Sequence, residues 1–214
     1  MANGNGRLVV NLLETNDQIQ RKILQAIATE TNKRITKNRT YVLNQLKQNL
    51  RSWLEMQPEI VELGQDGTGL NAELGLPAGS GRRAASVIVN AAVNSIETKI
   101  SKVNRNLKGG FVFNFQPRNL INLLSLPEAR IITEKGTSLD WLKWLLTMGD
   151  TPIIFGYDFL PTPGQGRSGG GTMVGGSMWR IEPKFAGTIN DNFITRSISG
   201  KEKTLEQILT RLLK

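Results

Sequence analysis

The residue types that most often carry catalysis are missing from this sequence. It contains neither cysteine nor histidine, which removes disulfides, thiolate nucleophiles and the commonest general base and metal ligand. Eighteen acidic residues remain, and paired carboxylates can hydrolyse glycosides or hold magnesium. They are scattered, however, and Asp150, Asp158 and Asp191 belong to no motif of that chemistry. A carboxylate hydrolase is therefore the least favoured hypothesis, and we predict no catalytic residue, no cofactor and no metal site.

The nearest approach to a phosphate-binding motif is the glycine-rich stretch 164–171. It has no closing Lys-Ser/Thr and leads into a strand-like segment, whereas phosphate loops present backbone N–H groups at a helix N-terminus. No acidic residue occurs from 159 through 181. We disfavour nucleotide binding. Plain flexibility is the favoured interpretation of this loop, and the alternative is that Gln165, Arg167 and Ser168 face DNA or an acidic protein partner.

Composition favours one folded domain without a membrane anchor. The 214 residues are 39% hydrophobic and 21% charged, which is typical of globular proteins. No apolar run approaches the roughly 20 residues that cross a bilayer, and the first residues lack the charged start and apolar middle of a signal peptide. We expect a protein that is made and kept in a cytoplasm and has no membrane partner.

Positive charge is concentrated in one segment. The chain carries a formal charge of +9, and residues 18–51 include eight bases against the single acid Glu30, an excess of seven. Such a segment attracts nucleic acid or acidic protein surfaces, although a solvated helix face would have the same composition. No helix-turn-helix, zinc or aromatic RNA-binding signature accompanies the charge. A basic nucleic-acid-binding protein is therefore the alternative functional hypothesis.

A long helical pattern occupies residues 15–56, as one helix or a helix pair. Thr15 and Gln18 have the form of a capping box, and Pro58 marks the end. A continuous helix would be about 60 Å long, so we expect it to protrude and to be covered by another subunit. The apolar positions that repeat near 3.6 residues form the predicted interface: Ile19, Ile23, Ile27, Ile35, Val42, Leu46, Leu50 and Trp53.

The remaining sequence alternates helical and strand patterns, which predicts an α+β fold. We expect helices over 82–103, 119–125, 138–148, 192–198 and 204–213, and strands over 111–115, 129–133, 153–160 and 172–181. The last two strands form a hairpin with the long loop 161–171, and one antiparallel sheet packs on the helices.

Several local signals refine these elements. Ser138 should cap its helix, and Thr204 with Gln207 resembles a capping box. The bases Lys99, Lys102, Arg105 and Lys108 would suit the C-terminal end of helix 82–103 through its dipole. Trp141 and Trp144 lie three residues apart and are interpreted as core or interface residues.

These elements divide the chain into five parts. We predict a flexible N-terminal arm over 1–16, a long helical segment over 17–63, a glycine-rich linker over 64–81, an α+β core over 82–200 and a C-terminal amphipathic helix over 201–214. A C-terminal helix this small must dock on its own domain or on another subunit.

Three short elements occur in a recognisable order. They are Thr68-Gly69-Leu70 through Leu74 after the long helix, Glu134-Lys135-Gly136-Thr137 within the sheet, and Phe193-Ile194-Thr195-Arg196 opening a late helix. This arrangement resembles the neck, tail-completion and tail-terminator proteins of long-tailed bacteriophages, and the segment 176–198 is similar to virion proteins of contractile-tailed phages. Two features depart from the family pattern: Asn192-Phe193 stands where the family has Pro-Phe, and the helix with Trp141 is inserted.

The resemblance implies a virion structural protein that acts by assembly rather than catalysis. Its members form rings where the capsid meets the tail, so it implies a homo-oligomer, expected to be hexameric, with other phage neck, connector or tail proteins as partners. It also implies assembly in the host cytoplasm and non-specific contact with DNA in the lumen. Closing a ring requires a heterologous interface, in which one patch meets a different patch on the next subunit.

Overall fold

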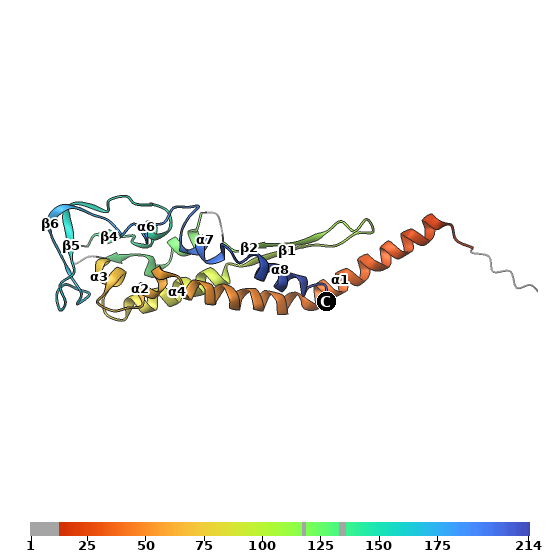
Figure 1. Cartoon of the computed structure of the whole chain (residues 1–214), viewed down its shortest axis with the longest axis horizontal. Helices are drawn as coiled ribbons and strands as arrows, with labels where there is room; N and C mark the ends of the chain where they lie inside the picture. The colour runs from red at the N-terminus through yellow and green to blue at the C-terminus, as the bar shows by residue number, and fades with distance from the viewer. Residues whose placement is uncertain (1–12, 117–118, 133–135) are drawn as a thin grey trace, which may run out of the picture.

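The chain folds into an elongated molecule built around one long helix. The computed structural model describes residues 13–116, 119–132 and 136–214. Helix α1 runs along one side, and its N-terminal turns extend beyond the other elements, while the β5–β6 hairpin lies at the opposite end (Figure 1). Most of the predicted arm 1–16, the end of the strand 129–133 and the Glu134-Lys135 half of the Gly-Thr element lie outside the described residues.

Helix α1 is a single uninterrupted helix over Asn16–Glu55. The predicted capping box is present, since the Thr15 side chain accepts from the Gln18 backbone and the Gln18 side chain accepts from the Thr15 backbone. After Met56 and Gln57 the chain turns, and Pro58 opens the next helix, where its missing N–H costs nothing. The choice between one helix and a helix pair is thereby decided in favour of one.

The glycine-rich segment 64–81 is part of the core, so the prediction of a linker was wrong. Helix α2 (Pro58–Leu63) is followed by α3 (Gly69–Glu73) and then by α4 (Ser80–Asn94). Leu70, Leu74 and Leu76 are buried in the main hydrophobic cluster, and Ala72 is also buried. Glycine permits the positive backbone φ angles between these short helices, while the leucines between the glycines bury apolar surface.

The helix predicted over 82–103 ends at Asn94, and its last third is a strand. β1 (Glu97–Ser101) pairs antiparallel with β2 (Gly110–Asn114), with Ile100 opposite Phe111. Cross-strand packing of Thr98 and Ile100 on the half-buried face overrides the helical periodicity. The basic residues from Lys99 to Lys108 therefore lie on a β-hairpin, and the helix-dipole interpretation of their charge was wrong.

Residues 121–146 form a series of short helices and strands. They are α5 (Ile121–Leu124), the 3-10 turn η1 (Pro127–Ala129), β3 (Ile131–Ile132), β4 (Ser138–Leu139) and α6 (Leu142–Leu146). Ser138 was predicted to cap a helix, but it pairs with Ile132 in β4 instead. The helix starts only after Trp141, because Ser138 and Leu139 pair with β3 as a strand.

The predicted single sheet is replaced by three separate two-stranded sheets. The long hairpin consists of β5 (Ile154–Leu160) and β6 (Thr172–Trp179), in agreement with the sequence, and it pairs with neither β1–β2 nor β3–β4 within the described residues. β3 and β4 have two residues each and are too short to connect the other hairpins. The coarse α+β class is confirmed, with a long N-terminal helix and small antiparallel hairpins.

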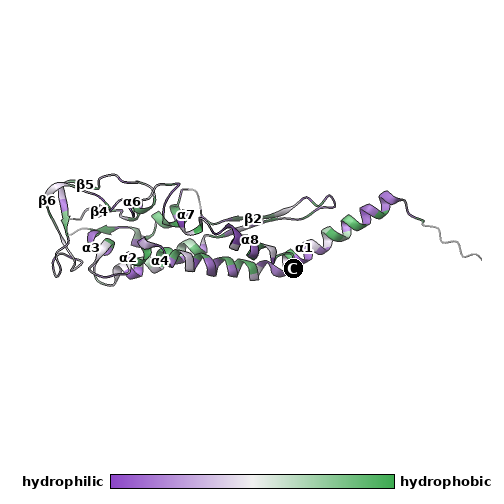
Figure 2. Ribbon diagram, viewed as in Figure 1, coloured by the Kyte–Doolittle hydropathy of each residue, from purple (hydrophilic) through white to green (hydrophobic). Residues whose placement is uncertain are grey.

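Two C-terminal helices return to α1. α7 (Phe193–Ile198) is capped by Asn192, whose side chain accepts from the Ile194 and Thr195 backbone N–H groups in a capping box. α8 is Glu202–Thr210 and starts two residues before the predicted Thr204 cap, so that box does not form. Figure 2 shows apolar bands along all of α1, including the protruding turns that no other described element covers.

Candidate functional site

The apolar stripe of α1 is covered by the chain's own fold over most of its length. Ile35, Val42, Leu46, Leu50 and Trp53 are all buried by intramolecular packing, largely against α4, α7 and α8. They cannot form a subunit interface in this conformation, so the prediction was wrong for these five positions. The sequence did not reveal this packing, because apolar periodicity indicates that a helix face will be covered but does not show which element covers it.

The first turns of α1 remain uncovered. Ile23 is 54% and Ile27 45% exposed, while Ile19 is partly buried. We call Ile19, Ile23 and Ile27 the helix surface. It borders an apolar groove of about 390 Å³ whose lining includes Leu107 of the β1–β2 hairpin and Leu209 and Leu213 of the C-terminal region. Ile23 and Ile27 are the positions of the predicted interface that remain exposed, and their contact with another subunit stays a prediction.

Trp141 belongs to the core and Trp144 lies at its edge. Trp141 is fully buried, whereas Trp144 is partly buried and packs against the main cluster. Of this pair only Trp144 has surface left for a partner. The core interpretation therefore applies to Trp141.

The loop 161–171 folds back onto α3 instead of projecting as a free tip. The Arg167 Nε donates to the Gly75 carbonyl at 2.8 Å and its Nη1 donates to the Ile132 carbonyl at 3.3 Å. Ser168 is buried, and its hydroxyl donates to the Ala72 carbonyl at 3.4 Å. Among the three residues predicted to face a partner, only Gln165 presents a side chain that is both exposed and without a hydrogen bond within the described chain.

Glycines of this loop allow its backbone to lie close to neighbouring segments of the chain. A Cβ placed on Gly170 would lie 1.8 Å from the Gly67 carbonyl oxygen and 2.8 Å from the Ala72 Cβ. A Cβ on Gly171 would lie 2.4 Å from the Phe159 ring. Only residues without a side chain fit between β5 and α3, so glycine here indicates packing rather than flexibility.

A group of exposed apolar side chains lies on β5–β6 and was not predicted. Phe155 is 74% exposed and stands opposite Met178 in the register. Asp158 is the single charged residue of the two strands, and its carboxylate already accepts from the Ser177 N–H and hydroxyl. We call the exposed apolar residues of these strands the hairpin surface: Ile154, Phe155, Tyr157, Leu160, Met173, Val174 and Met178.

A sequence signal for the hairpin surface existed. Apolar residues occupy almost every position from 153 to 160, without the alternation of a half-buried strand. Such a pattern is typical of a strand covered on both faces. A two-stranded sheet at the end of the molecule (Figure 1) leaves much of that surface open, and natural edges are usually protected by charge.

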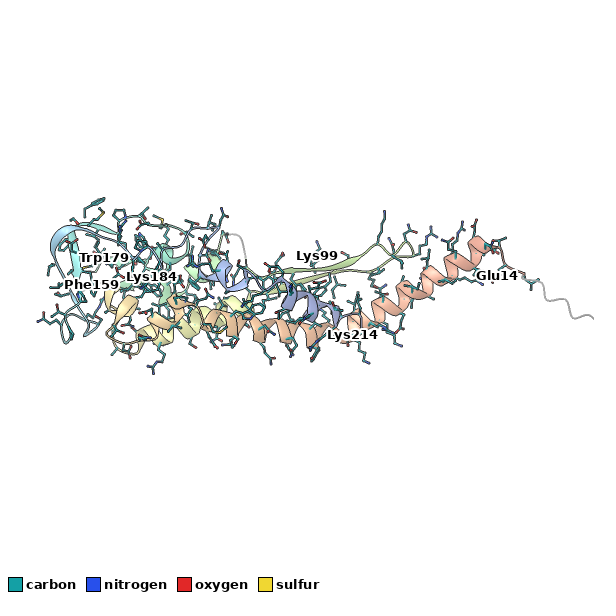
Figure 3. The ribbon with its side chains drawn as sticks, in the orientation of Figure 1. Glu14, Lys99, Phe159, Trp179, Lys184 and Lys214 are labelled. Carbon is teal, nitrogen blue, oxygen red and sulfur yellow. The ribbon has the colours of Figure 1, made fainter. Side chains whose placement is uncertain are left out.

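One carboxylate near the hairpin has altered acid–base chemistry. Glu73, at the end of α3, is partly buried, and this burial together with repulsion from Glu182 raises its pKa to about 7. The Trp179 indole, the Glu182 backbone and Lys184 offset part of that effect. Figure 3 shows Trp179 and Lys184 at the same end of the molecule as Phe159. The group could hold or release a proton near neutral pH beside the titratable side chains of Glu182 and Lys184. A raised pKa next to a second carboxylate does not by itself define a catalytic site.

The three aspartates considered for catalysis are not brought together. Asp150 pairs with Arg180 at 2.7 Å, Asp158 binds Ser177, and Asp191 pairs with Arg196 at 3.0 Å. Across residues 13–116, 119–132 and 136–214, no cluster of three or more acidic side chains could hold a metal ion. No helix in these ranges has the length and apolar character needed to span a bilayer.

Comparison with known proteins gives no relative. No protein-family model matches the chain, and neither a curated protein nor a solved structure is significantly similar to it.

Proposed function

We propose that this protein is a structural subunit of a tailed bacteriophage that forms a closed homo-oligomeric ring at the head–tail junction, as a neck, tail-completion or tail-terminator protein. It acts by assembly, and it has no catalytic role in the virion. The order of sequence elements that resembles these families supports this function, and the mixed α+β fold with a protruding helix is compatible with it.

The observation that carries the proposal is a pair of uncovered apolar surfaces at opposite ends of an elongated molecule. The hairpin surface lies at one end and the helix surface at the other (Figures 1 and 2). Because one copy cannot bring the two together, each must be covered by a neighbour, and a contact between two different patches repeats around a ring. We infer that the hairpin surface of one copy covers the helix surface of the next.

Light scattering and negative-stain electron microscopy of the purified chain test this proposal. The wild type should form closed rings, for which we expect six subunits. The double variant Phe155→Asp, Met178→Asp places two charges on the hairpin surface and should weaken association about tenfold or more, because charge at the apolar centre of an interface is strongly disfavoured.

The control is Ile121→Asp, which adds a charge at a 57% exposed residue of α5, outside both surfaces. It should assemble as the wild type does. A wild-type chain that stays monomeric at high concentration and does not bind tail tubes or connectors would contradict the proposal. So would equal association of the hairpin double variant and the wild type.

A further inference from the structure

Three lysines from two distant parts of the chain line a single hollow. Lys33 and Lys37 lie one turn apart on α1, and Lys102 follows β1. With Thr29, Asn32 and Thr36 they line a shallow depression of about 530 Å³, which we call the lysine hollow. A helix face alone would give two of these lysines. The third is supplied by the β1–β2 hairpin.

Specific hydrogen bonds hold the hairpin in this position. The Asn32 carbonyl accepts from the Val103 backbone N–H at 2.9 Å, and its amide donates to the Val103 carbonyl at 2.8 Å. Further along, the Arg39 guanidinium donates to the Thr98 hydroxyl at 3.0 Å. Lys102 is adjacent to Val103, so its backbone is fixed against α1 and its place beside Lys33 and Lys37 is built into the fold.

The positive charge of the hollow is not neutralised within the described part of the chain. None of the three lysines has an ion pair or a side-chain hydrogen bond there. Glu30 is the nearby acid on α1, but it is paired with Arg34 at 2.9 Å. The pKa of Glu30 is lowered by that bond first, and also by Lys33 and Lys37. Like charges gathered in one hollow repel one another, and a polyanion bound there would relieve the repulsion.

The surrounding surface extends the charge over a greater length. Lys99, Arg105 and Lys108 lie on the same hairpin, and no acidic residue occurs from 98 to 127. Figure 3 shows Lys99 on the hairpin, away from the end that carries Trp179. Phe111 and Phe113 are partly buried against the core, so the hairpin offers no aromatic platform on which single-stranded bases could stack.

We propose that the lysine hollow, together with the basic β1–β2 hairpin, binds the phosphate backbone of double-stranded DNA without reading its sequence. Lysine ammonium groups act as point charges for phosphate, and such contacts position a duplex without specifying bases. The residues are distinct from the helix and hairpin surfaces, so this binding goes beyond the assembly function and does not depend on it.

Fluorescence anisotropy with a labelled random duplex of about 30 base pairs tests the proposal, with salt varied between about 50 and 200 mM. The wild type should bind with a steep negative slope of log K against log salt. The variant Lys33→Gln, Lys37→Gln, Lys102→Gln should bind at least tenfold more weakly at about 100 mM salt, with a slope smaller by about 2 to 3. Binding should be indifferent to sequence.

A matched control separates a site from overall charge. The variant Arg82→Gln, Arg130→Gln, Lys143→Gln removes the same three charges from exposed positions elsewhere that have no ion pair among the described residues. It should bind the duplex within about threefold of the wild type. Equal weakening of the two variants would overturn the proposal, because it would show a net-charge effect without a site.

Two further outcomes would overturn the assignment to duplex DNA. Tighter binding to the corresponding single strand would be one, and equally effective competition by a polyglutamate peptide would be the other, since it would indicate an acidic protein partner. Undetectable binding at about 50 mM salt would reject the proposal outright. Light scattering of the same samples reports ring formation separately, so failure to bind DNA and failure to assemble remain distinguishable.

Discussion

At the scale of single residues, Glu73 connects stability to pH. Its folded-state pKa of about 7 exceeds the ordinary value of 4.5, because burial and then Glu182 disfavour the carboxylate. The folded chain therefore holds this proton more tightly than the unfolded chain. The resulting stabilisation is fully present below about pH 4.5 and is lost as pH rises through about 7.

The substitution Glu73→Gln tests this linkage. Glutamine cannot ionise, so at pH 8 the variant should be more stable than the wild type by roughly 2 kcal/mol, and the difference should vanish towards about pH 4. Urea unfolding at both pH values measures it. The exposed Glu55→Gln serves as the control for removal of a carboxylate from α1. A wild type and a Glu73→Gln variant of equal stability at pH 8 would contradict the raised pKa.

A second residue-scale prediction concerns a buried ion pair. Glu59 is only 1% exposed, and one of its carboxylate oxygens pairs with Arg196, while the other has no partner among the described residues. Arg196→Met would strand a buried charge and should lower the free energy of unfolding by about 3 kcal/mol. Calorimetry or urea unfolding would show this loss.

The second ion pair of Arg196, with Asp191, provides a comparison for the effect of burial. Asp191 pairs with the same guanidinium at 3.0 Å but is mostly exposed. Asp191→Asn should therefore cost less than about 1 kcal/mol. Adding Glu59→Gln to Arg196→Met should restore part of the lost stability, because the stranded charge is removed. Equal effects of Arg196→Met and Asp191→Asn would show that burial of Glu59 does not matter.

At the scale of elements, two asparagines of α1 attach different parts of the chain to that helix. Asn32 makes two hydrogen bonds to Val103 of the β1–β2 region, and Asn38 donates to the carbonyls of Arg211 and Leu212 after α8. Asn32→Ala should increase amide exchange over 97–114 and leave 202–213 unchanged, while Asn38→Ala should do the reverse. Each substitution should lower the free energy of unfolding by about 1 kcal/mol for every hydrogen bond that it removes. Hydrogen exchange that rises equally in both regions would contradict these separate attachments.

The elements that could be predicted from the sequence are those with local signals. The capping box at Thr15 and the proline at position 58 locate both ends of α1, and the phenylalanine alternation around Phe113 locates β2. The end of α4 could not be found this way. Residues 95–103 continue the helical period, and only pairing with β2, more than ten residues away, makes 97–101 a strand.

The residues of the candidate surfaces also differ in whether a local sequence signal could predict them. Exposure of Ile23 and Ile27 follows from a helix longer than the domain that covers it, so it could be predicted from length alone. Burial of Ser168 could not, because it depends on where α3 lies relative to the loop. Lys102 joins Lys33 and Lys37 through a contact between residues 71 apart, which no local pattern encodes.

At the scale of the whole molecule, charge is distributed asymmetrically. We call residues 13–47, 97–112 and 201–214 the basic arm; it carries fifteen basic and six acidic residues, an excess of nine positive charges. The rest of the described chain carries nine basic and eleven acidic residues. Two basic arms side by side would repel, whereas the basic arm of one copy and the weakly acidic remainder of another copy would not. The charge pattern therefore favours contact between different ends, in agreement with the proposed heterologous interface.

A mixing experiment distinguishes this arrangement from a symmetric dimer. A chain that lacks residues 1–27 has lost the helix surface but keeps the hairpin surface, and the Phe155→Asp, Met178→Asp variant has the opposite defect. If the hairpin surface contacts the helix surface, neither should close a ring, and their equimolar mixture should give heterodimers, each joined by one intact contact.

Mass photometry or sedimentation velocity of the mixture reads the result directly. A complex of two different chains, with no larger species, is expected, because each heterodimer ends in two disabled surfaces. Self-association of the truncated chain alone would instead mean that the hairpin surface pairs with itself, as in an isologous dimer. That outcome would replace the ring by a twofold assembly, since a patch that covers its own copy leaves nothing for a third subunit.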